Sequence, residues 1–355
     1  MLMRSLSHTH GRAASFNTPN RFEKTHLEKL DIEVPYDEEA PPLPTTFYSD
    51  TSRTILAKND SPDLPFAYSV NPYRGCEHGC IYCYARPSHE YLGFSAGLDF
   101  ETKIMVKMDA AELLAGQLNR RSWEPQMVAL SGNTDCYQPA ERKLLLTRRI
   151  LEVFLDYRNP VSLITKNALV VRDIDIIGEM ARLGLIHVML SITTMDAGLA
   201  RTMEPRTSHP QKRLDAIGEL ARCGVPVGVN VAPVVPGLTD EEIPAILSAA
   251  RDHGATSASY ILLKLPGAVE PLFLDWLNRS LPLRAGKIVS RIQDTRGGRL
   301  NDSRFGLRMT GAGEIAGAIG TLFALRAARL GLSTRWEKLS TSQFRRPSKT
   351  QLEIF

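Results

Sequence analysis

The amino-acid sequence predicts an α/β fold, a partial (β/α)6 TIM-like barrel of parallel strands with an N-terminal arm and a C-terminal helical extension. Short β-branched runs alternate with amphipathic helical segments through residues 67–266. Such alternation indicates a parallel sheet with right-handed crossovers. Six strand–helix units fill about 200 residues, whereas a closed eight-stranded barrel takes roughly 250. We therefore expect an open six-unit sheet or a partial barrel.

Each expected strand is a short run rich in apolar or β-branched residues. In chain order the runs are AYSVN near 67, MVALS at 127, VSLIT at 161, HVMLSIT at 187, VGVNVAPVV at 227 and SASYILL at 257. The segments between most of them have a helical period. They include DAAELLAGQL from 109, PAERKLLLTRRILEVFLDY from 139 and DEEIPAILSAARDHG from 240.

The chain divides into three predicted regions. Residues 1–50 are polar and contain prolines, with no persistent period, and we expect a partly disordered arm there. Residues 51–266 hold the strand–helix core. Residues 267–355 form an extension that we expect to be basic and mostly helical, with an Ala/Gly-rich helix near 311–331.

Composition places few limits on the partners of the protein. A net charge of +4 is only mildly basic and does not by itself argue for nucleic acid. No apolar run approaches the roughly 20 residues that cross a bilayer, and the start of the chain has no apolar signal segment. The cysteines number five and lie mostly in one loop, which is unlike a secreted disulfide framework. We therefore expect a cytoplasmic protein that does not contact a membrane.

Polar residues follow five of the six expected strands. The cysteine loop follows the first strand, SGNTDCYQP (131–139) the second and KN (166–167) the third, while SITT (191–194) ends the fourth and Asn230 lies late in the fifth. The carboxyl ends of parallel strands meet at one rim, where α/β proteins place their sites. We therefore expect these groups to surround one site.

The cysteine loop, RGCEHGCIYCYA (74–85), holds Cys76, Cys80 and Cys83 with the spacing C-x3-C-x2-C. A structural zinc site needs four ligands, and no other Cys or His has a suitable spacing. A [4Fe–4S] cluster with three protein thiolates leaves one iron open to another ligand. The spacing favours such a cluster, with structural zinc and simply buried thiols as the alternatives.

With Tyr82 before the third cysteine, the motif resembles the radical S-adenosylmethionine (SAM) superfamily signature. The longer segment NPYRGCEHGCIYCYARPSHEYLG resembles the spore photoproduct lyase-like branch, in particular an uncharacterised bacterial subfamily. The resemblance covers roughly residues 45–355.

The resemblance implies a [4Fe–4S] cluster and SAM as cofactors. The cluster would reductively cleave SAM to a 5′-deoxyadenosyl radical that abstracts hydrogen from the substrate. SAM would occupy the iron that no cysteine binds, which explains why the loop has three cysteines. An external electron donor, flavodoxin-like or ferredoxin-like, is also implied.

Further site residues follow from the same resemblance. Tyr82 would pack beside the cofactor. Four residues of the second strand end, Ser131, Gly132, Asn133 and Thr134, match the motif that contacts the SAM amino group. Lys166 would lie near the SAM carboxylate, or else be a solvated charge at the rim.

Three more residues have both a functional and a structural interpretation. Ser191 and Thr193 match the position that meets the ribose, or are ordinary strand residues. Arg206 would face a carboxylate, or form a local ion pair.

Cys136 is the candidate hydrogen-atom donor in this interpretation. Photoproduct lyase has such a cysteine on its second strand, whereas Cys136 comes a few residues later, in the loop. A small packed residue is the alternative. Cys223, at a predicted helix end, is expected to be structural.

The substrate is unknown from sequence. Residues 284–308 hold seven Lys and Arg against two Asp, and residues 335–349 hold five against one Glu. These segments either contact phosphates or are solvated helix faces. Two functions remain, a radical SAM enzyme whose substrate is unknown, with a nucleic acid base as a candidate, and a non-catalytic, metal-stabilised nucleic-acid-binding protein.

Overall fold

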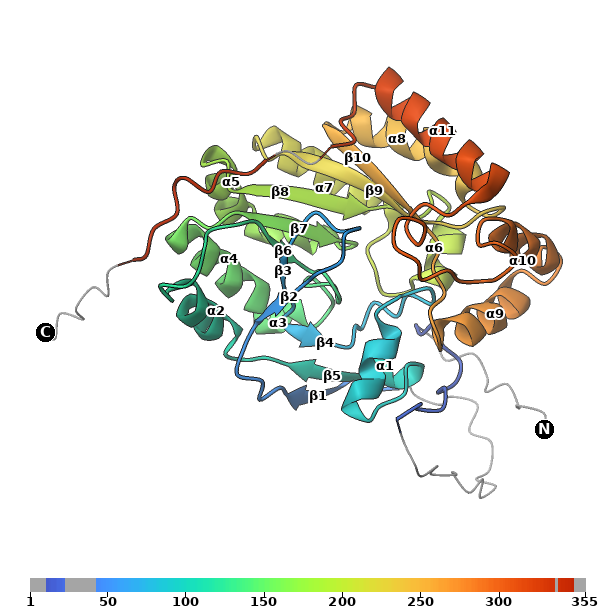
Figure 1. The fold of residues 1–355 in the computed structure, drawn as a ribbon, viewed down its shortest axis with the longest axis horizontal. Helices are drawn as coiled ribbons and strands as arrows, with labels where there is room; N and C mark the ends of the chain where they lie inside the picture. The colour runs from blue at the N-terminus through green and yellow to red at the C-terminus, as the bar shows by residue number, and fades with distance from the viewer. Residues whose placement is uncertain (1–10, 23–42, 336–337, 348–355) are drawn as a thin grey trace, which may run out of the picture.

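The computed structural model describes residues 11–22, 43–335 and 338–347. Its centre is a seven-stranded sheet with the strand order β10-β9-β8-β7-β6-β3-β2 (Figure 1). Neighbours from β3 to β10 pair in parallel, whereas β2 pairs antiparallel with β3. The strands are β2 (Leu56–Lys58), β3 (Tyr68–Val70), β6 (Val128–Leu130), β7 (Val161–Thr165), β8 (Ile186–Ser191), β9 (Val227–Val234) and β10 (Ser257–Leu262). The predicted α/β class and its six parallel strands are confirmed.

The central strands are almost continuously hydrophobic because both of their faces are buried. Strand β8 is buried at every position, and β9 at all but one. Parallel sheets are covered by helices on the faces that would otherwise meet water. The covering helices include α2 (Ala110–Leu118), α4 (Leu146–Tyr157), α5 (Ile174–Arg182), α7 (Pro210–Arg222) and α8 (Ile243–Asp252).

The long helix expected from residue 139 is interrupted. The structure has α3 (Glu141–Leu144) and then α4, with Leu145 in the left-handed region at φ 54°. The buried Glu141 carboxylate accepts hydrogen bonds from the first backbone N–H groups of α4, Leu146 (3.1 Å) and Thr147 (3.0 Å). The carboxylate therefore starts a new helix at a point where the sequence pattern alone predicts continuation.

A second, three-stranded sheet with the order β1-β5-β4 was not predicted from the sequence. Its strands are β1 (Thr46–Ser49), β4 (Tyr73–Arg74) and β5 (Lys103–Val106). They are short, and β1 falls in the region expected to be an arm. Because β4 ends just before Cys76, this small sheet fixes the entry to the cysteine loop.

Residues 11–22 pack against the body of the protein. Arg12 Nη1 donates to the Glu101 carbonyl oxygen (2.8 Å), and the Ala14 N–H donates to the Glu101 carboxylate (3.1 Å). Ser15 Oγ donates to Asp275 (2.6 Å). This packing differs from the expected arm, while residues 1–10 and 23–42 lie outside the described residues.

The remaining helices lie around the cysteine loop and in the C-terminal region, where α11 lies beside α8 (Figure 1). They are α1 (Leu98–Thr102), α6 (Ala197–Met203), α9 (Val269–Ser280), α10 (Ala285–Asp294), α11 (Gly313–Arg329) and the short 3-10 helices Arg86–Leu92, Ala168–Asp173 and Asp240–Glu242. The region boundaries at 50 and 266 stay predictions. In the described part of the chain, no helix combines the length and apolarity needed to span a membrane.

Candidate active site

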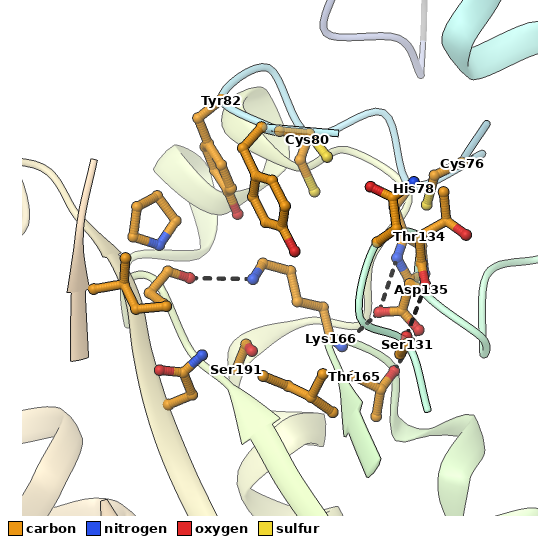
Figure 2. Close-up of a pocket in the computed structure, with 18 of the residues that line it drawn as sticks. Cys76, His78, Cys80, Tyr82, Ser131, Thr134, Asp135, Thr165, Lys166 and Ser191 are labelled. Carbon is orange, nitrogen blue, oxygen red and sulfur yellow. Dashed lines mark hydrogen bonds and ion pairs between the residues drawn. The ribbon is translucent and has the colours of Figure 1, made fainter. Parts of the chain in front are cut away.

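A cavity of about 180 Å³ lies at the carboxyl ends of the parallel strands. Figure 2 shows the cysteine loop on one side of it and Lys166, Thr165 and Ser191 at the strand ends. Its lining includes Cys76, His78, Cys80, Tyr82, Cys83, Tyr84, Ser131, Asn133, Thr134, Asp135, Thr165, Lys166, Ser191, Asn230 and Lys264. The predicted gathering of polar residues at one rim is therefore what the structure has.

The three thiols of the cysteine loop face this cavity. Cys76, Cys80 and Cys83 are free cysteines, of which the first two are buried. Burial raises the pKa of all three thiols. Metal binding requires the thiolate form, so binding here must displace the thiol protons.

The Arg86 side chain supports the cysteine loop. Its buried guanidinium donates to the carbonyl oxygens of Cys80 (3.0 Å) and Gly79 (3.1 Å) and pairs with the buried Glu101 carboxylate at 2.6 Å. Gly79 has φ +66°, and a Cβ there would lie 2.7 Å from Glu101 Oε2. Glycine at this position therefore lets the loop approach the ion pair that supports it.

Backbone hydrogen bonds attach the loop to three neighbouring segments. The Cys76 N–H donates to the Phe100 carbonyl (2.9 Å), and the Ile81 N–H donates to the Met203 carbonyl (2.9 Å). The Glu77 N–H donates to Gln138 Oε1 (2.9 Å). Hydrogen bonds to three neighbouring segments therefore fix the backbone of the loop that carries the thiols.

His78 and Asp135 join the loop to the second and third strand ends. His78 Nδ1 lies 3.4 Å from Asp135 Oδ2, and its Nε2 lies 3.2 Å from the Asn167 amide nitrogen. The Asn167 side-chain oxygen already accepts from the Leu169 N–H, so its NH₂ group faces the imidazole. The amide group of Asn167 therefore faces Nε2 of the imidazole, and Nδ1 faces the Asp135 carboxylate.

The Asp135 carboxylate accepts several hydrogen bonds. It accepts from Thr165 Oγ1 (2.7 Å) and from the Lys166 backbone N–H (2.8 Å). Burial alone would raise its pKa, but His78 and these hydrogen bonds hold the pKa at about 2. Asp135 thus carries a fixed negative charge beside the cysteine loop.

A second buried network anchors Tyr82. Its hydroxyl donates to the Glu204 carboxylate and lies 3.1 Å from Thr193 Oγ1. The same carboxylate pairs with Arg213 at 2.5 Å. Burial raises the pKa of Tyr82 well above its usual value. The ring of Tyr82 is therefore held as a fixed, neutral part of the cavity lining.

Lys166 extends from the end of β7 into the cavity (Figure 2). Its Nζ donates to the Ala232 carbonyl oxygen (3.1 Å) and lies 5.8 Å from the centroid of the Tyr82 ring. Within the described residues, no carboxylate oxygen lies within 4.0 Å of Nζ. The ammonium group is therefore available to an anionic group of a ligand.

The second strand end forms a tight turn beside the cavity. Ser131 has φ +80°, and its hydroxyl donates to the Thr134 carbonyl (2.8 Å) and accepts from the Cys136 N–H (2.8 Å). The Gly132 carbonyl accepts from the Tyr84 hydroxyl (2.7 Å). Because of this turn, Ser131, Asn133 and Thr134 line the cavity, whereas Gly132 contributes a backbone contact to Tyr84.

Three predicted site residues lie away from the cavity lining. Thr193 is fully buried against Tyr82 and Glu204. Arg206 pairs at 3.1 Å with Glu77 of the cysteine loop, and not with a residue of its own segment. Cys136 is fully buried in the main core, where its surroundings fit a small packed residue.

Sequence reasoning missed several residues that shape the site. His78 lies inside the cysteine motif and Asp135 directly after SGNT, so both positions could have been considered. Tyr84 and Lys264 also line the cavity. Arg86 lies on the chain just after the motif, but its role depends on Glu101, which is contributed by a different segment.

The chemistry of the thiols fits an iron–sulfur cluster better than one metal ion. In the described residues, no three His, Cys, Asp or Glu side chains are grouped to hold a single ion. A zinc ion draws its ligands to about 2.0–2.3 Å from one point. Cysteines that ligate a [4Fe–4S] cluster bind separate irons and need no such convergence.

The sequence matches the family model described as the Radical SAM superfamily over residues 70–250. It is 39% identical to the uncharacterized protein Rv2578c of Mycobacterium tuberculosis over 252 residues, 70% of this chain and 73% of that protein. It is 30% identical to the uncharacterized protein MJ0683 of Methanocaldococcus jannaschii over 175 residues, 49% of this chain and 63% of that protein.

Among solved structures, the fold is similar to that of spore photoproduct lyase. A mutant with bound AdoMet and dinucleoside spore photoproduct has a TM-score of 0.57 at 16% identity, covering 83% of this chain and 86% of that one. Another mutant has a TM-score of 0.56 at 17% identity, covering 81% and 80%. At this identity the likeness concerns the fold.

The parallel sheet and the three-cysteine loop over its carboxyl ends define the class as an iron–sulfur enzyme with an α/β fold. The chain belongs to the radical SAM superfamily. Its cofactors are a [4Fe–4S] cluster and SAM, and its chemistry is that of a radical SAM enzyme. The alternative of a non-catalytic binding protein is set aside.

Proposed function

We propose that this enzyme abstracts a hydrogen atom from a nucleic acid base, for repair or modification. When bound, the cluster supplies the electron that cleaves SAM to methionine and a 5′-deoxyadenosyl radical. Cys76, Cys80 and Cys83 bind the cluster, and Lys166 binds the SAM carboxylate. A flavodoxin-like or ferredoxin-like protein of the cytoplasm delivers the electron.

The protein's own residues position these groups. Arg86 and the backbone bonds of the cysteine loop fix the thiols, and Asp135 ties that loop to the strand end carrying Lys166. Ser131, Asn133 and Thr134 offer polar groups for the SAM amino end, and Ser191 offers a hydroxyl for the ribose. Tyr82 contributes a flat, neutral face beside them.

The observation that carries the proposal is the shared cavity. Three cysteines, the SGNT turn, Lys166 and Ser191 come from separate strand ends, yet all contribute to one lining. The choice of a nucleic acid base is supported by the fold of spore photoproduct lyase, one structure of which holds a dinucleoside spore photoproduct.

The two basic segments support this choice unequally. Arg345 and Arg346 donate to the carbonyl oxygens of Asp156 and Arg120, near the ends of α4 and α2. These positions lie by the amino ends of the strands, away from the cavity (Figure 1). Residues 336–337 and 348–349 of that segment lie outside the described residues. The segment 284–308 follows β10 and is the better candidate for phosphate contacts.

Within 284–308, the arginines have different surroundings. Arg296 is buried and donates to the carbonyl oxygens of Leu262 and Leu263, so it supports the fold. Three arginines are exposed, Arg284, Arg299 and Arg304, of which Arg284 donates to the Gly237 carbonyl oxygen (3.1 Å) and Arg304 pairs with Asp302 at 2.6 Å. We expect Arg299 and Arg304, and not Arg296, to contribute to phosphate binding.

The enzyme reaction is tested by anaerobic incubation of the reconstituted protein with dithionite and SAM. We expect 5′-deoxyadenosine, measured by chromatography and mass spectrometry, and a change in its rate when oligonucleotides are added. Absence of 5′-deoxyadenosine from protein with a full cluster would contradict the proposed reaction.

The nucleic acid part is tested separately by the salt dependence of binding. Each phosphate contact on duplex DNA contributes about −0.9 to the slope of log affinity against log salt concentration. Arg299→Ala with Arg304→Ala should flatten the slope by up to about two. A slope near zero for the wild type on single-stranded DNA, duplex DNA and RNA would rule out nucleic acid.

A further inference from the structure

Lys264 lines the cavity from the end of β10, the sixth parallel strand. It lies two residues beyond Leu262 and is half-buried. None of the functional roles described above uses it. It is nevertheless part of the same lining as Cys83 and Lys166.

The ammonium group of Lys264 has weak partners. Nζ lies 3.6 Å from Met309 Sδ and 4.5 Å from the centroid of the Tyr84 ring. A thioether is a weak acceptor, and an ammonium group has three protons to donate. In the described part of the chain, no carboxylate oxygen lies within 4.0 Å of Nζ. Most of its hydrogen-bonding capacity is therefore unused.

Charged groups of both signs lie near Lys264. Burial, with Arg308 and Arg296 nearby, lowers the pKa of Lys264 to about 8, although Asp63 and the Cys83 thiol act in the opposite direction. Arg308 is paired with Asp63 at 2.6 Å, so that carboxylate is already engaged. The Arg308 charge is thus neutralised by its own partner, whereas the described residues place no carboxylate oxygen within 4.0 Å of Lys264 Nζ.

The position of Lys264 is fixed before any ligand arrives. Buried Arg296 donates to the carbonyl oxygens of Leu262 (3.2 Å) and Leu263 (2.6 Å), the two residues before Lys264. The Leu262 N–H donates to the Met309 carbonyl (2.9 Å). The backbone that leads to Lys264 therefore needs no rearrangement when an anion binds.

A half-buried cation without a counter-ion is unfavourable, and an anionic ligand relieves that cost. The proposed function assigns the SAM carboxylate to Lys166, which leaves Lys264 for a second anion. Lysine binds phosphate oxygens as a point charge through charge-assisted hydrogen bonds. We propose that Lys264 binds a phosphate group of the substrate at the end of β10.

This inference rests on the proposed function and makes the substrate a phosphate-bearing molecule. The probes are the dinucleotide TpT, thymidine 5′-monophosphate, inorganic phosphate, thymidine and acetate. Binding to the anaerobic holoenzyme with SAM is measured by calorimetry. TpT carries a diester and the monophosphate a monoester, so the pair separates a nucleic acid backbone from a free nucleotide as the source.

We expect saturable binding of inorganic phosphate and of at least one phosphate-bearing nucleotide. Lys264→Gln should weaken the binding of phosphate-bearing probes about ten- to a hundredfold more than the binding of thymidine, since a charge-assisted hydrogen bond is lost. Lys264→Arg should retain most of the affinity. Lys212→Gln, an exposed lysine on α7 outside the segment 284–308, serves as the matched control and should change nothing.

Three results would overturn the inference. One is the absence of saturable phosphate binding by the wild type, and another is acetate binding as tight as phosphate binding. The third is a loss of SAM affinity in Lys264→Gln as large as in Lys166→Ala, which would assign Lys264 to SAM. The proposed reaction has its own readout, because failure to form 5′-deoxyadenosine in the wild type would contradict that reaction whatever the probes do.

Discussion

On the cysteine loop, Arg86 donates to the carbonyl oxygens of Gly79 and Cys80 and pairs with buried Glu101. At the strand ends of the same cavity, Lys166 and Lys264 extend their ammonium groups toward one carbonyl, one thioether and two aromatic rings. The Arg86 guanidinium is in contact with a carboxylate, whereas no carboxylate oxygen of the described residues lies within 4.0 Å of either lysine ammonium group. We infer that the loop is built to hold its shape, whereas the lysines are completed by ligands.

The largest effect should come from removing the thiols themselves. The triple variant Cys76→Ala, Cys80→Ala, Cys83→Ala should lose its cluster, so that iron falls from about four per chain to near zero. Iron and sulfide analysis after anaerobic reconstitution measures this. Cys223→Ala removes an exposed cysteine and should keep its iron. Retention of about four irons by the triple variant would refute the ligand assignment.

Breaking the support of the loop should be the next largest effect. Arg86→Met leaves the Glu101 carboxylate buried without its partner, which should cost about 3–5 kcal/mol of unfolding free energy. Denaturant unfolding measures the change. Arg142→Met, at an exposed position on α3, is the control and should lie within about 0.5 kcal/mol of the wild type. Equal stability of the two variants would show that the ion pair does not support the loop.

Lys166→Ala should leave the cysteine loop intact and weaken the binding of SAM. A charge-assisted hydrogen bond is worth about 1.5–3 kcal/mol, so SAM affinity should fall about ten- to a hundredfold while iron content is kept. Equilibrium binding of SAM to the reconstituted protein measures this, with Lys143→Ala on α3 as the exposed control. An unchanged dissociation constant would place Lys166 outside the SAM site.

The smallest effect is expected for Cys136→Ala. Because Cys136 is packed in the main core, we expect a loss of about 1 kcal/mol in unfolding free energy. The rate of 5′-deoxyadenosine formation should match the wild type. Loss of substrate turnover with normal SAM cleavage would instead support the sequence-based hypothesis of a hydrogen-atom donor.

Much of the fold was predictable because its signals are local. Strands β7, β8 and β9 are apolar runs bounded by turns, and their chain order sets the parallel sheet. The break at Leu145 depends on the Glu141 carboxylate and was missed. The pairing of β1 with β5 joins segments more than 50 residues apart, which no local pattern in this sequence indicates.

The site divides in the same way. Cys76, Cys80, Cys83 and Lys166 could be named because a motif and the strand ends point to them. Arg86 needs Glu101, and Lys264 needs the observation that no carboxylate approaches it. Such facts concern tertiary partners, and a single sequence does not contain them.

The packing of residues 11–22 has a consequence for how the enzyme is assembled. Arg12 and Ala14 reach Glu101 across 89 and 87 residues of chain, and Ala13 and Ala14 share an apolar cluster with Cys80. Contacts between segments so distant in the chain are slow to close, so we expect this segment to settle after the cysteine loop has formed. Limited proteolysis of residues 11–22 before and after reconstitution of the cluster would report whether this segment settles together with the loop.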